Sequence, residues 1–241
     1  MRTFRANQPG DVSNEITLTG LGTSSEKVIG IDFRQSDRTL YALSDASKIY
    51  SVAPTITSTN TAALTNVSTL DKPINTGSTQ YTLDFNPLIP TSDSLQNRLR
   101  LIGADGSNVV VNVETGAVGT NTPLTPSTPV VKGAAYLNNF RTSTVTSLLV
   151  INRANSSLNV QDTSTGVLTR LSALGITLDG NSPVGFDISG RNNENQLLMA
   201  RTADSGNFSL YRVNTSATTS PLTLVGTLAS SSDFIDIAIR F

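Results

Sequence analysis

The stretch that decides the fold is Val184-Gly185-Phe186-Asp187-Ile188, an apolar run that contains a single aspartate. Similar runs occur at residues 28–33, 81–85 and 234–239, and each of them also contains an Asp. A further run at residues 131–136 has Ala135 where the others have Asp. Short runs rich in β-branched and aromatic residues are typical of buried β-strands. The chain is therefore expected to repeat one strand-containing unit.

The spacing of these runs gives the size of the unit. Aligned on the aspartate, the repeated positions lie about 52, 51, 52 and 49 residues apart by subtraction; they are Asp32, Asp84, Ala135, Asp187 and Asp236. A period of roughly 40 to 50 residues is that of a propeller blade with four strands. The repeat therefore predicts an all-β fold, a β-propeller of five blades with about 50 residues each.

The residues between the repeated runs agree with this prediction. Second strands are expected at 39–43, 99–102, 148–151 and 197–200, and third strands at 48–52, 109–113, 158–160 and 210–213. Turns rich in Asn, Asp, Thr and Gly follow the third strands, and these residues tolerate turn geometry. No stretch has a sustained apolar period of 3.6 residues, which excludes a helical fold.

The chain is expected to be a single domain, residues 1–241. The predicted blades cover about 28–70, 81–128, 131–176, 183–228, and 234–241 together with 1–21. In the last blade, residues 234–241 supply the first strand, 1–6 the third and 15–18 the fourth. Pairing the C-terminal strand with the N-terminal strands closes the ring and removes two exposed sheet edges. Either this blade has only three strands or its second strand lies before Met1, and the second alternative is favoured.

Composition excludes several classes of function. The chain has no His and no Cys, so it lacks a Ser-His-Asp triad, thiolate chemistry, and His- or Cys-ligated metals. A formal net charge of -1 without a basic run argues against a nucleic-acid partner. No apolar run approaches the roughly 20 residues of a membrane span. Charged residues make up only 15%, with Ser, Thr and Asn in their place, which favours a secreted or cell-surface location.

Several segments resemble a known family. The runs 28–34 with 40–43, 83–87 with 97–101, and 184–188 are similar to the domain-of-unknown-function 4394 (DUF4394) family, and 131–140 is the most specific element. The resemblance covers essentially the whole chain and departs from the family pattern at residues 88–96, a polar insertion. It implies a bacterial, secreted propeller-like repeat protein, and it supplies no activity, cofactor or catalytic residue.

The repeated aspartates are the sharpest candidate site. First strands are innermost in a propeller, so Asp32, Asp84, Asp187 and Asp236 are expected near the axis. One interpretation is a carboxylate ring that holds a cation such as Ca²⁺, which prefers oxygen ligands. The favoured interpretation is structural: each Asp accepts hydrogen bonds from the neighbouring blade, because unpaired carboxylates converging on an axis would repel. No metal site is therefore assigned.

Two further groups are candidates for ligand binding. Asn138 and Asn139 follow the atypical first strand and would either present amides to a sugar or close a turn, and the turn is favoured. Arg98 and Arg100 share one face of a strand, with Arg34 and Arg38 in the preceding blade, and would bind an anionic glycan or carboxylate. A solvated strand face, or pairing with nearby Asp residues, is the usual outcome for such charges. No residue is assigned as catalytic.

Two hypotheses about function follow. The first is a non-enzymatic, extracytoplasmic interaction module that binds a glycan, a cell-surface component or a protein. The alternative is a glycan-active hydrolase or lyase that uses axial Asp residues. Two solvent-open carboxyl groups in one pocket would favour the enzyme. Carboxylates that are fully hydrogen-bonded to backbone amides would favour the interaction module.

Overall fold

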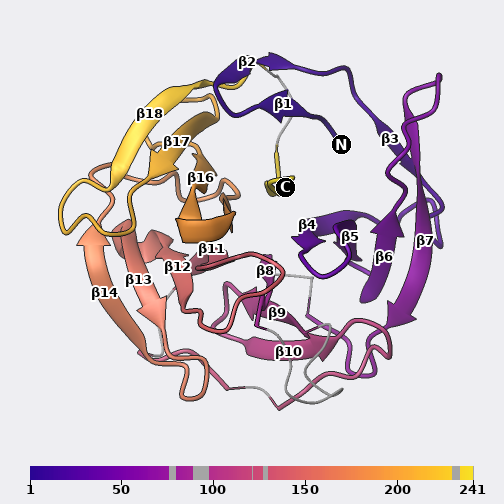
Figure 1. Ribbon diagram of the computed structural model, residues 1–241, viewed down its shortest axis with the longest axis horizontal. Helices are drawn as coiled ribbons and strands as arrows, with labels where there is room; N and C mark the ends of the chain where they lie inside the picture. Colours follow the sequence, from indigo (N-terminus) through magenta and orange to yellow (C-terminus); the bar gives the residue numbers. More distant parts are fainter. Residues whose placement is uncertain (76–79, 89–97, 121, 127–129, 230–233, 241) are drawn as a thin grey trace.

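The computed structural model describes residues 1–75, 80–88, 98–120, 122–126, 130–229 and 234–240. Its regular structure consists of β-strands and two single-turn 3-10 helices, η2 (Arg153–Asn155) and η3 (Arg191–Asn193). Four sheets radiate from a common centre in a β-propeller arrangement (Figure 1). This confirms the predicted all-β propeller architecture. Among the described residues, no helix has the length and apolar character needed to span a membrane.

Each blade is an antiparallel meander whose first strand lies innermost. The first blade contains β4 (Val28–Arg34), β5 (Thr39–Ser44), β6 (Lys48–Val52) and β7 (Thr61–Thr69). The second contains β8 (Tyr81–Phe85), β9 (Arg98–Gly103) and β10 (Asn108–Asn112). The third contains β11 (Val131–Tyr136), β12 (Leu148–Asn152), β13 (Ser157–Gln161) and β14 (Leu168–Ala173). The fourth contains β15 (Gly185–Ser189), β16 (Asn195–Ala200), β17 (Ser209–Val213) and β18 (Leu222–Thr227).

The second blade is less regular than the others. Its fourth strand is reduced to a single bridge between Val111 and Val118. Most of the polar insertion predicted at 88–96 lies outside the described residues.

Apolar side chains fill the spaces between neighbouring blades. One core cluster joins Tyr41 and Leu43 of the first blade to Phe85 and Leu99 of the second, and the Tyr41 and Phe85 ring centroids lie 5.3 Å apart. Strand alternation directs every second side chain into such an interface. The dispersion and burial of these side chains stabilise one blade against the next.

Two glycines in the innermost strands permit close approach of the next blade. A Cβ atom at Gly133 would lie 2.8 Å from Phe186 Cβ, and one at Gly185 would lie 2.7 Å from the backbone nitrogen of Ile237. A glycine has no Cβ, so it suits positions where another backbone or side chain comes this near. These glycines allow the first strands to pack around the axis.

The N-terminal strands differ from the prediction. Residues 4–12 form a hairpin of β1 (Phe4–Arg5) and β2 (Gln8–Val12). The hairpin lies beside β18. The approach is close, because a Cβ atom added to Gly226 of β18 would lie 2.9 Å from Pro9 Cγ of β2. A single third strand over 1–6 is therefore wrong. The predicted fourth strand at 15–18 is also wrong, because β3 (Thr17–Thr19) instead pairs in parallel with β7 of the first blade.

The C-terminal segment reaches the centre of the ring but is not a strand. Residues 234–240 pair with no sheet, which contradicts the predicted strand at 234–241, and Phe241 lies outside the described residues. The segment ends near the middle of the ring in Figure 1. Its side chains Phe234, Ile237 and Ile239 pack in one core cluster with Phe4 of the N-terminal hairpin and Met199 of the fourth blade.

Candidate functional site

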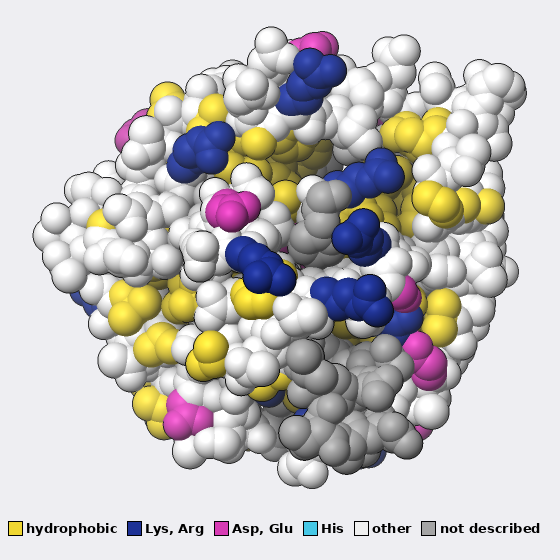
Figure 2. Space-filling model, in the orientation of Figure 1, with side chains coloured by type: hydrophobic (Ala, Val, Ile, Leu, Met, Phe, Trp, Pro, Cys, Tyr) yellow, Lys and Arg dark blue, Asp and Glu magenta, His cyan; other side chains and the backbone are white. Residues whose placement is uncertain are grey.

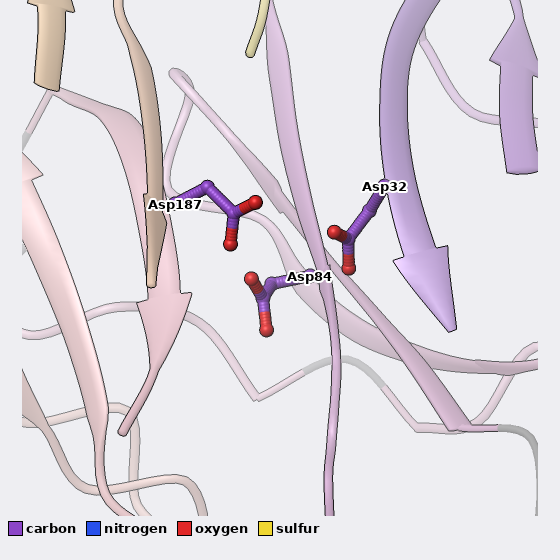
Figure 3. A group of neighbouring side chains, drawn as sticks. All are labelled: Asp32, Asp84 and Asp187. Carbon is purple, nitrogen blue, oxygen red and sulfur yellow. The ribbon is translucent and has the colours of Figure 1, made fainter. Parts of the chain in front are cut away.

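Three of the predicted aspartates meet at the axis. Asp32 comes from β4, Asp84 from β8 and Asp187 from β15, and each side chain points toward the other two (Figure 3). The residues are only 2%, 1% and 3% exposed, respectively. One carboxylate oxygen from each lies within 4.8 Å of the others. The repeat therefore brings these three residues together, as the sequence predicted, and buries them.

Each carboxylate binds the backbone of the next blade. Asp32 Oδ2 accepts a hydrogen bond of 2.8 Å from the N–H of Phe85, the residue after Asp84. Asp84 Oδ1 accepts one of 3.2 Å from the N–H of Tyr136, the residue after Ala135. The first strands thus run in the same direction and in one register around the axis. The Asp side chains satisfy N–H groups that the strand ladders leave unpaired.

The C-terminal segment follows this rule with an unexpected residue. Asp187 Oδ2 accepts from the N–H of Ile239, so the position that matches the other aspartates is Ala238. Asp236 lies two residues earlier, where it accepts 3.1 Å and 2.9 Å bonds from the N–H groups of Ile31 and Ile237. The alignment of Asp236 with the other three is corrected accordingly. Asp236 therefore also accepts hydrogen bonds from backbone N–H groups, but it does so two residues before the axial position Ala238.

Burial and mutual repulsion dominate the electrostatics of the cluster. Burial raises the pKa values of Asp32 and Asp84 well above their ordinary range, and the neighbouring carboxylates raise them further. Burial raises the pKa of Asp187 to about 6 and that of Asp236 to about 8, although backbone N–H donors act in the opposite direction. All four carboxyl groups therefore hold their protons to higher pH than an exposed Asp does, and Asp236 keeps its proton at neutral pH.

A bound hard cation could neutralise the negative charge of these buried carboxylates in place of protons. Asp187 Oδ1 is buried and accepts no hydrogen bond from the described residues. Three oxygens that lie within 4.8 Å of one another fit around one ion, because Ca²⁺ holds its oxygen ligands at roughly 2.3 to 2.6 Å. Asp32, Asp84 and Asp187 are thus the residues that could hold a metal. Protons and a cation are alternative occupants of the same place.

The predicted asparagines join two connections on one face of the ring. Asn138 has a φ of 55°, its N–H donates to Asn193 Oδ1, and its Nδ2 donates to the carbonyl of Val145 at 3.1 Å. Asn139 is 1% exposed, and its carbonyl accepts from the N–H of Gly190 at 3.2 Å. These contacts tie the connection after β11 to the connection after β15. Asn138 itself is half-buried.

The two predicted arginines differ in their surroundings. Arg100 is buried, with Nε donating to Tyr136 Oη at 2.8 Å and Nη1 to Asn108 Oδ1 at 2.7 Å. It joins the second blade to Tyr136 of the third, and its side chain is committed to these contacts. Arg98 begins β9 and is half-buried.

Sequence reasoning missed two sets of residues. The first is a buried carboxylate, Glu26, which accepts from Ser44 Oγ at 2.6 Å, Tyr50 Oη at 2.8 Å and Lys48 Nζ at 3.2 Å. Burial alone would raise the pKa of Glu26, but these partners together lower it to about 2. No motif marks this cluster, because Glu26 precedes β4 whereas its partners lie about 20 residues later, Ser44 on β5 and Lys48 and Tyr50 on β6.

The second set is a group of exposed arginines that follow the innermost segments: Arg38, Arg141, Arg191 and Arg240. Only Arg38 was among the candidates that the sequence indicated. Each stands two to six residues after the axial position of its blade, counted from Asp32, Ala135, Asp187 or Ala238. Aligning the connections as well as the strands would have shown this pattern.

A separate hollow of about 810 Å³ lies between the third and fourth blades. Its lining includes Arg153, Asn155, Ile176, Leu178 and Thr202. None of the axial carboxylates lines it, so it is not part of the candidate site.

Comparison with known proteins places the chain in a family. Residues 1–238 match the family described as "Domain of unknown function (DUF4394)". The chain belongs to the DUF4394 family. This membership confirms the resemblance seen in the repeated segments. No functionally curated protein matches the sequence.

Several solved structures resemble this DUF4394 chain at low sequence identity. The WD40 domain of Toxoplasma gondii coronin is 14% identical with a TM-score of 0.49, over 86% of this chain and 48% of that chain. Hydrazine synthase of Kuenenia stuttgartiensis is 13% identical with a TM-score of 0.45, over 87% and 52%. PorZ, a surface component of the type-IX secretion system of Porphyromonas gingivalis, is 20% identical with a TM-score of 0.38, over 88% and 24%. The match spans about half of the first two chains and a quarter of the third.

Proposed function

We propose that this protein is a non-enzymatic, extracytoplasmic interaction module that binds a glycan, a cell-surface component or a protein. The observation that carries the proposal is the state of the axial carboxylates. Asp32, Asp84 and Asp187 are almost completely buried, and each accepts a backbone N–H from a neighbouring segment. A glycosidase needs carboxyl groups that reach the substrate and water. These side chains are engaged in holding blades together.

The proposal includes a closed ring of five blades. The fifth consists of the C-terminal segment as its innermost part and the β1–β2 hairpin farther out. Its support is threefold: Asp236 accepts from Ile31 of the first blade, Asp187 of the fourth blade accepts from Ile239, and β2 lies beside β18. In addition, the Phe234 ring lies edge-on to Phe208, with centroids 5.5 Å apart. Closure is thus achieved by side-chain bonds and core packing, without a C-terminal strand.

The extracytoplasmic location is supported by composition. Charged residues make up only 15% of the chain, which is rich in Ser, Thr and Asn instead. Family membership gives no activity to transfer. Substrate turnover is disfavoured because the described residues contain no exposed pair of carboxylates at the axis and the chain has no histidine.

A combined binding and turnover screen tests the proposal. The wild-type protein and the Asp84→Asn variant are applied to a glycan array and incubated with a polysaccharide panel that is then assayed for new reducing ends and unsaturated products. We expect binding by both proteins and product formation by neither. Product formation by the wild type that Asp84→Asn abolishes would overturn the proposal and establish the hydrolase or lyase instead.

A further inference from the structure

Exposed arginines gather at one mouth of the ring. The mouth is defined as the connections after β4, β11 and β15 (residues 35–38, 137–147 and 190–194) together with Arg240. The innermost strands run in one register, as the bonds from Asp32 to Phe85 and from Asp84 to Tyr136 require, so the ends of these strands emerge on the same face. Figure 1 shows these connections in front, around the centre of the ring.

The arginines of this mouth recur from blade to blade. They are Arg38, Arg141, Arg191 and Arg240, and all four are exposed. Figure 2 shows Lys and Arg side chains around the hollowed centre of this face. A protein with a net charge of -1 therefore concentrates positive charge at one end of its axis.

These four guanidinium groups are available to a ligand. The ion pairs found among the described residues use Arg2, Arg34 and Lys48, and none involves the four. At this mouth, Asp37 is already bound by Arg34. Glu194 is also exposed in these connections, but the four arginines outnumber it and leave the mouth positively charged. A positive potential around a concave surface attracts anionic ligands and raises their association rate.

The mouth is partly organised in advance. The Arg191 guanidinium carbon lies 5.3 Å from the centroid of the Phe140 ring, so this aromatic face supports the cation. The bonds between Asn138 and Asn193 hold the two connections together. Arginine presents a planar fork that matches carboxylate and sulfate groups with two parallel hydrogen bonds. Nearby amides of Asn138, Asn192 and Asn193 suit the hydroxyl groups of a sugar.

We propose that this mouth binds an acidic polysaccharide, with the arginines pairing its carboxylate or sulfate groups. The inference rests on the proposed function and specifies its ligand class. Single-stranded nucleic acids bind to aromatic stacking platforms, whereas the exposed large apolar residues in the described part of the chain are all aliphatic. Several separated cations around one opening fit a polymer with repeated anionic groups better than one small anion.

The test compares two triple variants with equal changes in charge. The mouth variant carries Arg38→Gln, Arg141→Gln and Arg191→Gln. The control variant carries Arg5→Gln, Arg170→Gln and Arg212→Gln, which change exposed arginines on β1, β14 and β17. Binding to polygalacturonate, heparin and neutral dextran is measured by biolayer interferometry, and circular dichroism and urea unfolding establish that both variants fold as the wild type does.

We expect the wild type to bind polygalacturonate or heparin but not dextran, and to bind more weakly as salt increases. The mouth variant should bind at least about tenfold more weakly, equivalent to about 1.4 kcal/mol, and the control should bind within about twofold of the wild type. Equal loss in both variants would overturn the inference, as would tighter binding to polyuridylate or to an acidic protein than to either polysaccharide. If the wild type binds neither acidic polysaccharide but binds another ligand on the glycan array, the proposed ligand class is refuted. The proposed function as an interaction module would still stand.

Discussion

The backbone N–H of Ile239 donates to the Asp187 carboxylate, and this bond sets the register of the C-terminal segment. In the other blades the donor is the residue after the axial position, as Phe85 follows Asp84 and Tyr136 follows Ala135. Ile239 follows Ala238, which lies 51 residues after Asp187. The axial positions are therefore spaced by 52, 51, 52 and 51 residues, a more regular repeat than the alignment through Asp236.

Adding a methyl group to Gly185 should loosen the C-terminal segment. A Cβ atom there would lie 2.7 Å from the backbone nitrogen of Ile237 and 2.8 Å from its side chain. We expect Gly185→Ala to lower the free energy of unfolding by roughly 1 to 3 kcal/mol, as overpacking does. Gly206→Ala is the control, because a Cβ atom there has no neighbour within 4 Å. Urea unfolding followed by circular dichroism measures both, and equal stability of the two variants would contradict the close approach.

The structure explains which features the sequence could predict. The strands of the four blades were predictable because the apolar runs and the turns after them repeat with one period. The buried Asp32, Asp84 and Asp187 were predictable for the same reason. Local pattern could not predict that β3 pairs with β7, because this parallel pairing joins two segments that the repeat places in different blades.

The C-terminal register shows a further limit of the sequence. The run 234–239 contains one Asp between apolar residues, and the alternation of apolar side chains fits Asp236 or Ala238 equally well. Backbone contacts with the fourth blade decide between them. The arginines of the mouth stand in connections of unequal length, so an alignment of the strands alone does not bring them into register.

Two substitutions at Asp84 should differ in their effects. Asp84→Ala removes the acceptor for the Tyr136 N–H, and an unsatisfied buried donor costs roughly 1 to 3 kcal/mol. Asp84→Asn keeps an oxygen at this place and removes one charge from a repelling cluster. We therefore expect the Asn variant to be as stable as the wild type, or more stable at high pH. Urea unfolding at pH 8 checks this, and equal destabilisation by both substitutions would show that the charge itself is needed.

Stability should fall as the pH rises from about 4 to 8. The folded-state pKa is about 6 for Asp187 and about 8 for Asp236, whereas the unfolded value for Asp is about 3.9. Since these pKa values are raised on folding, the folded state binds more protons, and the stability from these groups is complete below about pH 4 and lost as the pH rises through the folded values. Glu26 acts in the opposite direction, because its pKa of about 2 gives stability that is lost as the pH falls below about 4.

Urea midpoints across this pH range provide the measurement. The Asp236→Asn variant should decline less steeply than the wild type over the whole range from about pH 4 to 8, because Asp236 binds its proton only in the folded state throughout this range. Repeating the series with Ca²⁺ and then with a chelator distinguishes protons from a cation as the occupant of the cluster. A bound cation would stabilise the deprotonated carboxylates, so stability would fall less steeply with rising pH. A stability that rises steadily from pH 4 to 8 in both proteins would mean that the axial carboxyl groups do not retain protons.

The register of the C-terminal segment has its own test at Ala238. If Ala238 is the axial position, Ala238→Asp adds a fourth carboxylate beside Asp32, Asp84 and Asp187, which already repel one another. We expect a loss of stability that grows with pH by up to about 1.4 kcal/mol per pH unit while the added group stays protonated in the fold. Ala238→Asn has nearly the same size without the charge, so its cost should not depend on pH beyond that of the wild type. Parallel pH slopes for the Asp and Asn variants would place residue 238 outside the cluster and restore the alignment through Asp236.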